Sequence, residues 1–163
     1  MAGPYDSRAV ANSILHNANE TGKKLTPMQL IKLVYVANGW SLALLNRPLI
    51  SEQIQAWQYG PVIPNVYRAF NRFGSAAITE YASDMFSKLE YRADMDDEEK
   101  RLIAAVVNSY GHMHAFQLSN KMHEADTPWT KTYNASGPYS VISPDLIKEH
   151  FLELKAKRNV EKV

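Results

Sequence analysis

Apolar residues cover almost every side of the segment from Pro27 to Leu45, and amphipathic patterns flank it on both sides. Thr26 can accept a hydrogen bond from a free amide at the start of this segment, and Gln29 can complete a capping box. A helix without a polar face is normally buried on several sides. Gly39 in its middle leaves room for a neighbouring helix. The pattern therefore predicts a central buried helix over about residues 27–45.

Polar and apolar residues alternate from Glu52 to Tyr59, which is the pattern of a half-buried strand. The strand is expected to end at Tyr59, because Gly60 permits a positive φ and Pro61 has no N–H for a strand ladder. Pro64 can then open a second helix, and Gly74 is placed to end it. This corner between strand and helix follows the central helix almost without a gap.

Amphipathic periodicity predicts four more helices, each with a start or stop signal. The acidic run from Asp96 to Glu99 is interpreted as a cap and first helical turn, where the helix dipole favours negative charge. The four helices are expected at about residues 7–19, 97–110, 114–123 and from residue 144 towards the end of the chain.

Two stretches have weaker patterns. Residues 85–91 alternate between apolar and polar side chains, which fits either a short strand paired with residues 54–59 or a loop. Residues 134–138 combine Asn, Ser, Gly and Pro and are predicted to form a loop. The whole pattern indicates a mainly α (α+β) fold, with one compact domain over residues 1–163 and a small β element near residues 52–59.

Composition narrows the function classes. The chain has 163 residues and 45% hydrophobic content, which is enough for one core. Its net charge of +1 gives no overall attraction to nucleic acid or to an anionic membrane, so neither partner is expected. It contains no cysteine, which excludes disulfides, thiolate zinc sites and a cysteine nucleophile and fits a cytoplasmic setting. The central apolar run is expected to fall short of the roughly 20 residues that span a bilayer.

Metal-ligand residue types gather in one stretch, which contains His112, His114, His123, Glu124 and Asp126. The first two histidines follow a helix end, where cationic side chains are favoured by the dipole alone, so we predict no bound metal and no cofactor. The chain has no nucleophile elbow and no glycine-rich phosphate loop. A binding protein is therefore expected in preference to an enzyme.

Short motifs distributed over most of the chain carry a family resemblance. They are Leu30-Ile31-Lys32-Leu33-Val34-Tyr35, Gly39-Trp40, Arg47-Pro48-Leu49, the run from Ala56 to Pro64, Val66-Tyr67, Leu118, His123, Pro128-Trp129, Ile142, Ile147 and Phe151. In this order they resemble the Panacea antitoxin domain, also called SocA-like or GepA-like. One position departs from the family pattern: Met122 stands where the family has a hydroxyl residue before the histidine.

The resemblance implies an antitoxin of a bacterial or prophage toxin–antitoxin system that binds a cognate toxin protein directly. Two alternatives stay open, a proteolytic adaptor that delivers the toxin to the ClpXP protease and a DNA-associated phage or repressor protein. A homo-oligomer also stays open. We expect the His123 ring to bond a backbone carbonyl and so hold the loop at Pro128. The motif residues with implied structural roles are Trp40, Gly60, Pro61, His123, Pro128 and Trp129.

The corner between strand and helix is the predicted partner-binding surface. Period two places Trp57 and Tyr59 on one face of the strand, and aromatic side chains are enriched at binding hot spots. We expect Tyr67 and Arg68 to be more exposed than these two strand aromatics. The residues predicted to contact the toxin are Gln55, Trp57, Tyr59, Tyr67 and Arg68.

Overall fold

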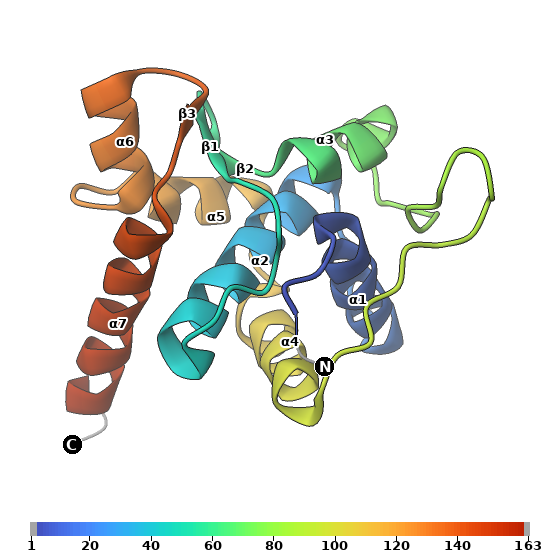
Figure 1. Ribbon diagram of the computed structural model, residues 1–163, viewed down its shortest axis with the longest axis horizontal. Helices are drawn as coiled ribbons and strands as arrows, with labels where there is room; N and C mark the ends of the chain where they lie inside the picture. Colours follow the sequence, from blue (N-terminus) through green and yellow to red (C-terminus); the bar gives the residue numbers. More distant parts are fainter. Residues whose placement is uncertain (1–2, 162–163) are drawn as a thin grey trace.

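Helix α2 (Pro27–Trp40) is the central buried element, and all of its residues from Leu30 to Trp40 are buried. The structure is a computed structural model that describes residues 3–161. The predicted capping box of Thr26 and Gln29 is present. The helix contacts α1, α3, α4, α5 and α7, so the prediction that neighbours surround it is confirmed (Figure 1).

The helical segment ends at Leu45, as the sequence predicts, but its last turn is not α-helical. The α-helix stops at Trp40, and Ser41–Leu45 form a π-helical turn, η1. Asn46 then takes a left-handed conformation with φ of +57°. The Ser41 hydroxyl donates to the carbonyl oxygen of Arg47 at 2.7 Å. The π-helical turn therefore ends the helix, and the side chain of its first residue, Ser41, bonds the backbone of the segment that follows.

Six further α-helices lie in the described part of the chain. They are α1 (Ser7–Glu20), α3 (Pro64–Phe70), α4 (Asp97–Tyr110), α5 (Ala115–Met122), α6 (Pro128–Ser136) and α7 (Pro144–Glu161), with a short 3-10 turn, η2 (Asn71–Phe73), after α3. Asp6 caps α1, and Asp96 caps α4 as the sequence predicts. Helix α6 contradicts the predicted loop at 134–138, because the helix continues to Ser136 before Gly137 ends it with φ of +84°.

A three-stranded antiparallel sheet lies at one end of the molecule, in the order β2-β1-β3 (Figure 1). Strand β1 (Gln55–Trp57) pairs with β2 (Gly60–Val62) as a hairpin and with β3 (Ser140–Val141) on its other side. The predicted strand at 52–59 is thus shorter than expected and turns at Gln58. Pro61 does not stop the sheet, because β2 is an edge strand and one of its sides needs no ladder donors.

The stretch at 85–91 forms a loop, and of the two open interpretations the strand pairing with residues 54–59 is wrong. A single bridge joins Ser83 to Glu90 at the base of this loop. The third strand of the sheet comes instead from residues 140–141, far along the chain.

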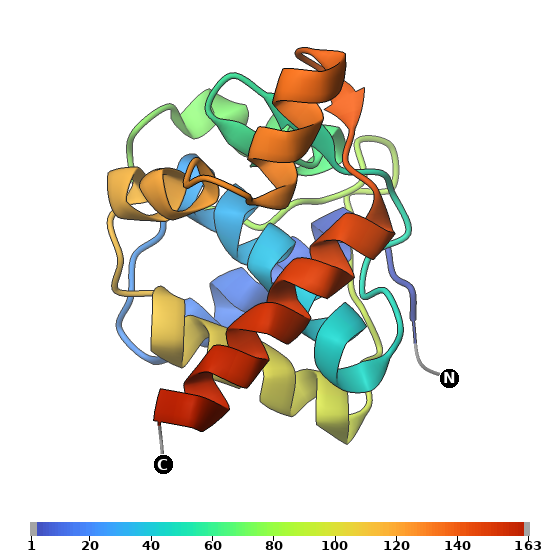
Figure 2. The same ribbon diagram turned by 90° about the vertical axis from the view of Figure 1, so that its left-hand side faces the viewer.

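Helix α7 crosses over α2, as Figure 2 shows. A Cβ atom at Gly39 would lie 2.2 Å from the ring of Phe151 in α7. That ring also packs edge-on against Trp40, with 5.1 Å between the centroids. The predicted close approach of a neighbouring helix is therefore confirmed, and it explains why position 39 carries no side chain.

The segment Pro27–Leu45 is long and apolar enough to span a membrane by length and composition alone, contrary to the expectation that it falls short. However, 72% of the most apolar 18 residues of this segment is buried inside the domain. The apolar character of α2 is therefore accounted for by its central place in the core.

Candidate functional site

Three aromatic side chains from separate parts of the chain meet at the surface of the sheet. The Trp57 ring lies edge-on to the ring of Tyr67 in α3 and to that of Tyr139, with 5.0 and 5.5 Å between the centroids. Trp57 is half-buried, whereas 39% of Tyr67 and 66% of Tyr139 is exposed. We refer to Trp57, Tyr67 and Tyr139 as the aromatic cluster. Its edge-on geometry is the one that aromatic rings prefer.

Two other predicted contact residues lie beside this cluster. Gln55 accepts a hydrogen bond from Trp57 Nε1 at 2.8 Å and so orients the indole. Tyr59 is 62% exposed, which is more than Tyr67, so the predicted order of exposure is wrong for Tyr59. The reason is the turn at Gln58, which takes Tyr59 off the strand face that Trp57 occupies.

Tyr139 belongs to the aromatic cluster but is absent from the predicted contact residues. Its backbone N–H donates to the carbonyl oxygen of Ala56 at 2.7 Å, and it has a positive φ of +67° directly after Pro138. The pairing of β3 with β1 therefore brings this residue to Trp57. The sequence does mark Tyr139 as an aromatic residue directly after a Gly-Pro turn. However, its partner strand lies about 80 residues away in the sequence, and periodicity within a short window cannot predict a contact at that separation.

Side chains of α5 and α6 hold the backbone of the hairpin from beneath. Trp129 Nε1 donates to the carbonyl oxygen of Trp57 at 2.6 Å. His123 Nε2 lies 3.1 Å from the carbonyl oxygen of Gln58, and its Nδ1 lies 2.6 Å from that of Ser119. The expected carbonyl contact of His123 is confirmed, but it holds the hairpin turn, and Pro128 and Trp129 begin α6 rather than a loop.

Lys32 supports the same hairpin from α2. It is 1% exposed, and its Nζ donates to the carbonyl oxygen of Pro61 at 2.9 Å. No carboxylate among residues 3–158, whose side chains the structure describes, pairs with it. Burial lowers the pKa of the Lys32 ammonium from 10.5 to about 7. A Cβ atom at Gly60 would lie 2.9 Å from Nζ, so glycine at this position leaves room for the amine beneath the hairpin.

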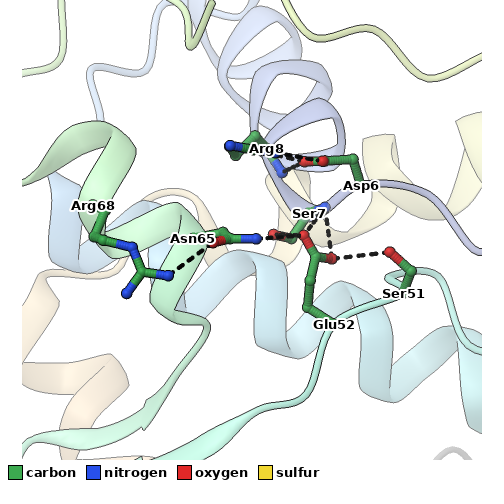
Figure 3. A network of polar contacts seen from close by, with 7 residues as sticks. All are labelled: Asp6, Ser7, Arg8, Ser51, Glu52, Asn65 and Arg68. Carbon is green, nitrogen blue, oxygen red and sulfur yellow. Dashed lines mark hydrogen bonds and ion pairs between the residues drawn. The ribbon is translucent and has the colours of Figure 1, made fainter. Parts of the chain in front are cut away.

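A network of polar contacts positions Arg68 on α3 (Figure 3). The Glu52 carboxylate accepts from the N–H and the hydroxyl of Ser7 at 2.9 and 2.8 Å. It also accepts from Asn65 Nδ2 at 3.1 Å, which turns the Asn65 oxygen towards Arg68 Nη2 at 2.9 Å. Arg68 forms no ion pair with any side chain in the described structure, so its charge is available to a partner.

The departure at Met122 does not remove the polar contacts around His123. The Thr127 hydroxyl donates to the Met122 carbonyl oxygen at 2.7 Å, and the Ser119 hydroxyl donates to that of Tyr59 at 3.1 Å. Two neighbouring hydroxyl residues thus bind main-chain groups in this region, while the Met122 side chain is buried in the core.

The histidines of the predicted metal-ligand stretch do not come together as a binding site. His112 and His114 are exposed between α4 and α5, whereas His123 is occupied by the hairpin. Among the side chains that the structure describes, no three from His, Asp or Glu are grouped so that they could hold a metal ion. The absence of a bound metal stays a prediction.

Comparison with known proteins supports the family resemblance carried by the motifs in the hairpin and in the residues that hold it. Residues 30–130 match the sequence model of the family described as antitoxin SocA-like, Panacea domain. The antitoxin SocA of Caulobacter vibrioides (strain NA1000 / CB15N) is 35% identical over 136 residues, which are 81% of this chain and 72% of that protein. No solved structure matches this chain. The matched range contains Lys32, the hairpin, His123 and Trp129.

Proposed function

Because the chain belongs to the SocA-like Panacea antitoxin family, we propose that it neutralises a cognate protein toxin by binding it directly through the aromatic cluster and Arg68. The single observation that carries this proposal is the exposed aromatic cluster on a hairpin whose backbone is fixed from beneath. Tryptophan, tyrosine and arginine are the residue types enriched at binding hot spots. All three occur here on neighbouring elements.

The fixed geometry of the cluster favours binding. Trp57 is oriented by Gln55 through its indole N–H and by Trp129 through its carbonyl, and Arg68 is oriented by Asn65. Side chains that are already ordered lose little conformational entropy when a partner covers them. This pre-organisation supports a contact made by the aromatic cluster without a large rearrangement.

Side chains, rather than the strand edge, are proposed to carry the affinity. Strand β3 has only two residues and β2 has three, so each edge offers few free main-chain groups to an added strand. Lys32 already donates to one carbonyl of β2. The exposed rings of Tyr67 and Tyr139 and the guanidinium of Arg68 remain as the larger contact area.

The test is a double variant, Tyr67→Ala with Arg68→Ala, measured against the product of a neighbouring reading frame that is toxic when expressed alone. Truncating a hot-spot residue typically costs about 2 kcal/mol or more, which is about thirtyfold in affinity. We expect the variant to fold, to bind the toxin at least about thirtyfold more weakly and to fail to rescue growth when both are expressed together.

The matched control is Phe116→Ala with Arg101→Ala, which removes an exposed aromatic and an exposed arginine from α5 and α4. It should bind and rescue like the parent. Unchanged affinity of a folded Tyr67, Arg68 double variant would place the toxin contact elsewhere.

A degradation assay with purified ClpXP separates simple blockade of the toxin from its delivery to the protease. Toxin that persists in the complex favours blockade.

A further inference from the structure

A second exposed apolar surface lies on the loop of residues 83–90, which extends from the body of the molecule beside α1 and α3 (Figure 1). Met85, Phe86 and Leu89 are 77%, 91% and 71% exposed. Three large apolar side chains are therefore exposed within five residues of one loop, and exposed apolar side chains gathered in this way mark interaction sites. These side chains do not pack in the core, and they are not part of the aromatic cluster.

The loop has a defined conformation of its own. Asp84 Oδ1 accepts from the backbone N–H groups of Phe86 and Ser87 at 3.0 and 2.8 Å. The Asp84 carbonyl oxygen accepts from the N–H of Lys88, and its own N–H donates to the Leu89 carbonyl oxygen at 2.8 Å. Lys88 has a positive φ of +63°, which closes the turn. One aspartate therefore organises the tip that presents the apolar side chains.

The base of the loop is joined to the core through Asn12 of α1, which is 7% exposed. Its Nδ2 donates to the carbonyl oxygens of Ala82 and Tyr91 at 2.8 and 2.9 Å, and its Oδ1 accepts from the Ala82 N–H at 2.8 Å. The two ends of the loop are thus clamped by one buried amide. A partner that binds the loop meets a surface that is already ordered.

Arginine side chains flank the loop. A cleft of about 280 Å³ between α1, α3 and the loop is lined by Arg8, Arg68 and Arg72 together with Met85, and no carboxylate lines it. Arg8 pairs with Asp6 at 2.8 Å, and Arg72 pairs with an exposed glutamate at 3.2 Å. Arg68 is therefore the cleft arginine whose charge is not balanced by a described carboxylate.

We propose that the loop of residues 83–90 is a second toxin contact, in which Phe86 enters an apolar pocket on the toxin and a carboxylate at the rim of that pocket pairs with Arg68. This inference rests on the proposed function and adds the chemistry of the partner. Arg68 and Met85 line one cleft, while Tyr67 is next to Arg68 on α3, so the aromatic cluster and the loop can be covered by one partner.

Charge favours this occupant over two others. In a twofold contact between copies through this face, the cleft arginines would meet arginines, since the cleft lining contains no acid. An anionic membrane surface would meet the carboxylates of Asp84 and Glu90 against the single ammonium of Lys88, so the loop that carries the apolar side chains has a formal charge of −1 and is repelled. A protein pocket with an acidic rim complements both the apolar side chains and Arg68.

The experiment is a titration of the purified full chain, with the product of a neighbouring reading frame that is toxic when expressed alone as the probe. The variant Phe86→Ser with Leu89→Ser should stay folded, because both side chains are exposed, and should bind about thirtyfold more weakly. The matched control Phe116→Ser removes another exposed phenylalanine, 81% exposed on α5, and should bind like the parent.

The outcomes separate the two proposals. If the parent does not bind the probe at all, direct toxin binding fails and the loop contact fails with it. If the parent binds and the loop variant binds equally well, the loop contact is overturned while the proposed function stands. Sedimentation of a parent dimer that the loop variant converts to a monomer would identify a second copy as the occupant. Flotation of the parent, but not the variant, with anionic vesicles would identify a membrane, and either result overturns the proposal.

Discussion

The aromatic cluster and the loop of residues 83–90 both expose apolar side chains on an ordered backbone, but different parts of the molecule order them. The backbone at the cluster is held by Lys32, His123 and Trp129, which come from the core helix and from two helices near the sheet. The tip of the loop is held by its own Asp84. Order at the cluster is therefore coupled to the whole fold, whereas order at the loop tip is local.

This difference has a dynamic consequence. Segments with few buried contacts open locally at a small free-energy cost, while segments bonded to the core open only with larger parts of the protein. Substitutions in the core should consequently disturb the cluster, and substitutions at the loop tip should leave the cluster and the melting temperature unchanged. Variants at Gly39, Lys32 and Asp84 test this contrast in order of decreasing effect.

The largest effect is expected from Gly39→Leu. Because a Cβ at this position would lie 2.2 Å from the Phe151 ring, α7 must move away from α2, which also carries Lys32. Overpacking of this kind costs about 3 kcal/mol at the upper end of its usual range. Thermal unfolding should show a large fall in Tm. Ala104→Leu, at an exposed position of α4, is the control and should melt like the parent. A parent-like Tm for the Gly39 variant would mean that α2 is not closely packed there.

A smaller and pH-dependent effect is expected at Lys32. The unfolded chain keeps the Lys32 proton up to a pKa of 10.5, while the folded protein releases it above about 7. Between these values the unfolded state binds more protons, so stability rises with pH. At 1.36 kcal/mol per pKa unit, the parent should gain roughly 2–3 kcal/mol from this group between pH 6 and 9.

Lys32→Met removes this contribution while keeping an apolar side chain of similar length under the hairpin. Urea unfolding at several pH values should show a flatter dependence for the variant, and at pH 6 the variant should lose little or even gain stability because a buried charge is gone. Lys100→Met, at an exposed lysine of α4, should keep the slope of the parent. Equal slopes for the parent and the Lys32 variant would show that Lys32 does not titrate in this range.

Local signals predicted most of the helical fold. Thr26 with Gln29 and Asp96 with Glu99 are capping boxes that can be recognised within four residues of sequence, and the structure contains both. The close approach at Gly39 is also predicted from the sequence, because a glycine inside an apolar helix leaves room for a neighbouring helix to pack against it. These features depend on neighbours in sequence, which a pattern analysis can examine.

The sheet and its supports depend on distant neighbours and were predicted poorly. Pro61 suggested the end of a strand, but a proline is tolerated on an edge strand, and only the tertiary structure shows which strand is the edge. The contact of Lys32 with Pro61 spans 29 residues, and that of Trp129 with Trp57 spans 72. Tyr139 is missing from the predicted contact residues for the same reason. The motif resemblance identified the supporting residues without showing what they touch.

The smallest effect on stability, and the sharpest test of the contrast, is expected from Asp84→Ala. The pKa of the Asp84 carboxyl is lowered because its charged form accepts the N–H groups of Ser87 and Phe86. The order it provides is therefore complete above the ordinary aspartate pKa of about 3.9 and is lost only as pH falls through the lower folded value. At neutral pH the variant should show faster hydrogen exchange at the amides of Phe86 and Ser87, with Tm and the exchange of the hairpin amides unchanged. Asp94→Ala, at an exposed aspartate four residues after the end of the loop, should leave both amides protected as in the parent. If the Asp84 variant instead lost Tm together with protection of the hairpin, the loop tip would be coupled to the whole fold in the same way as the aromatic cluster.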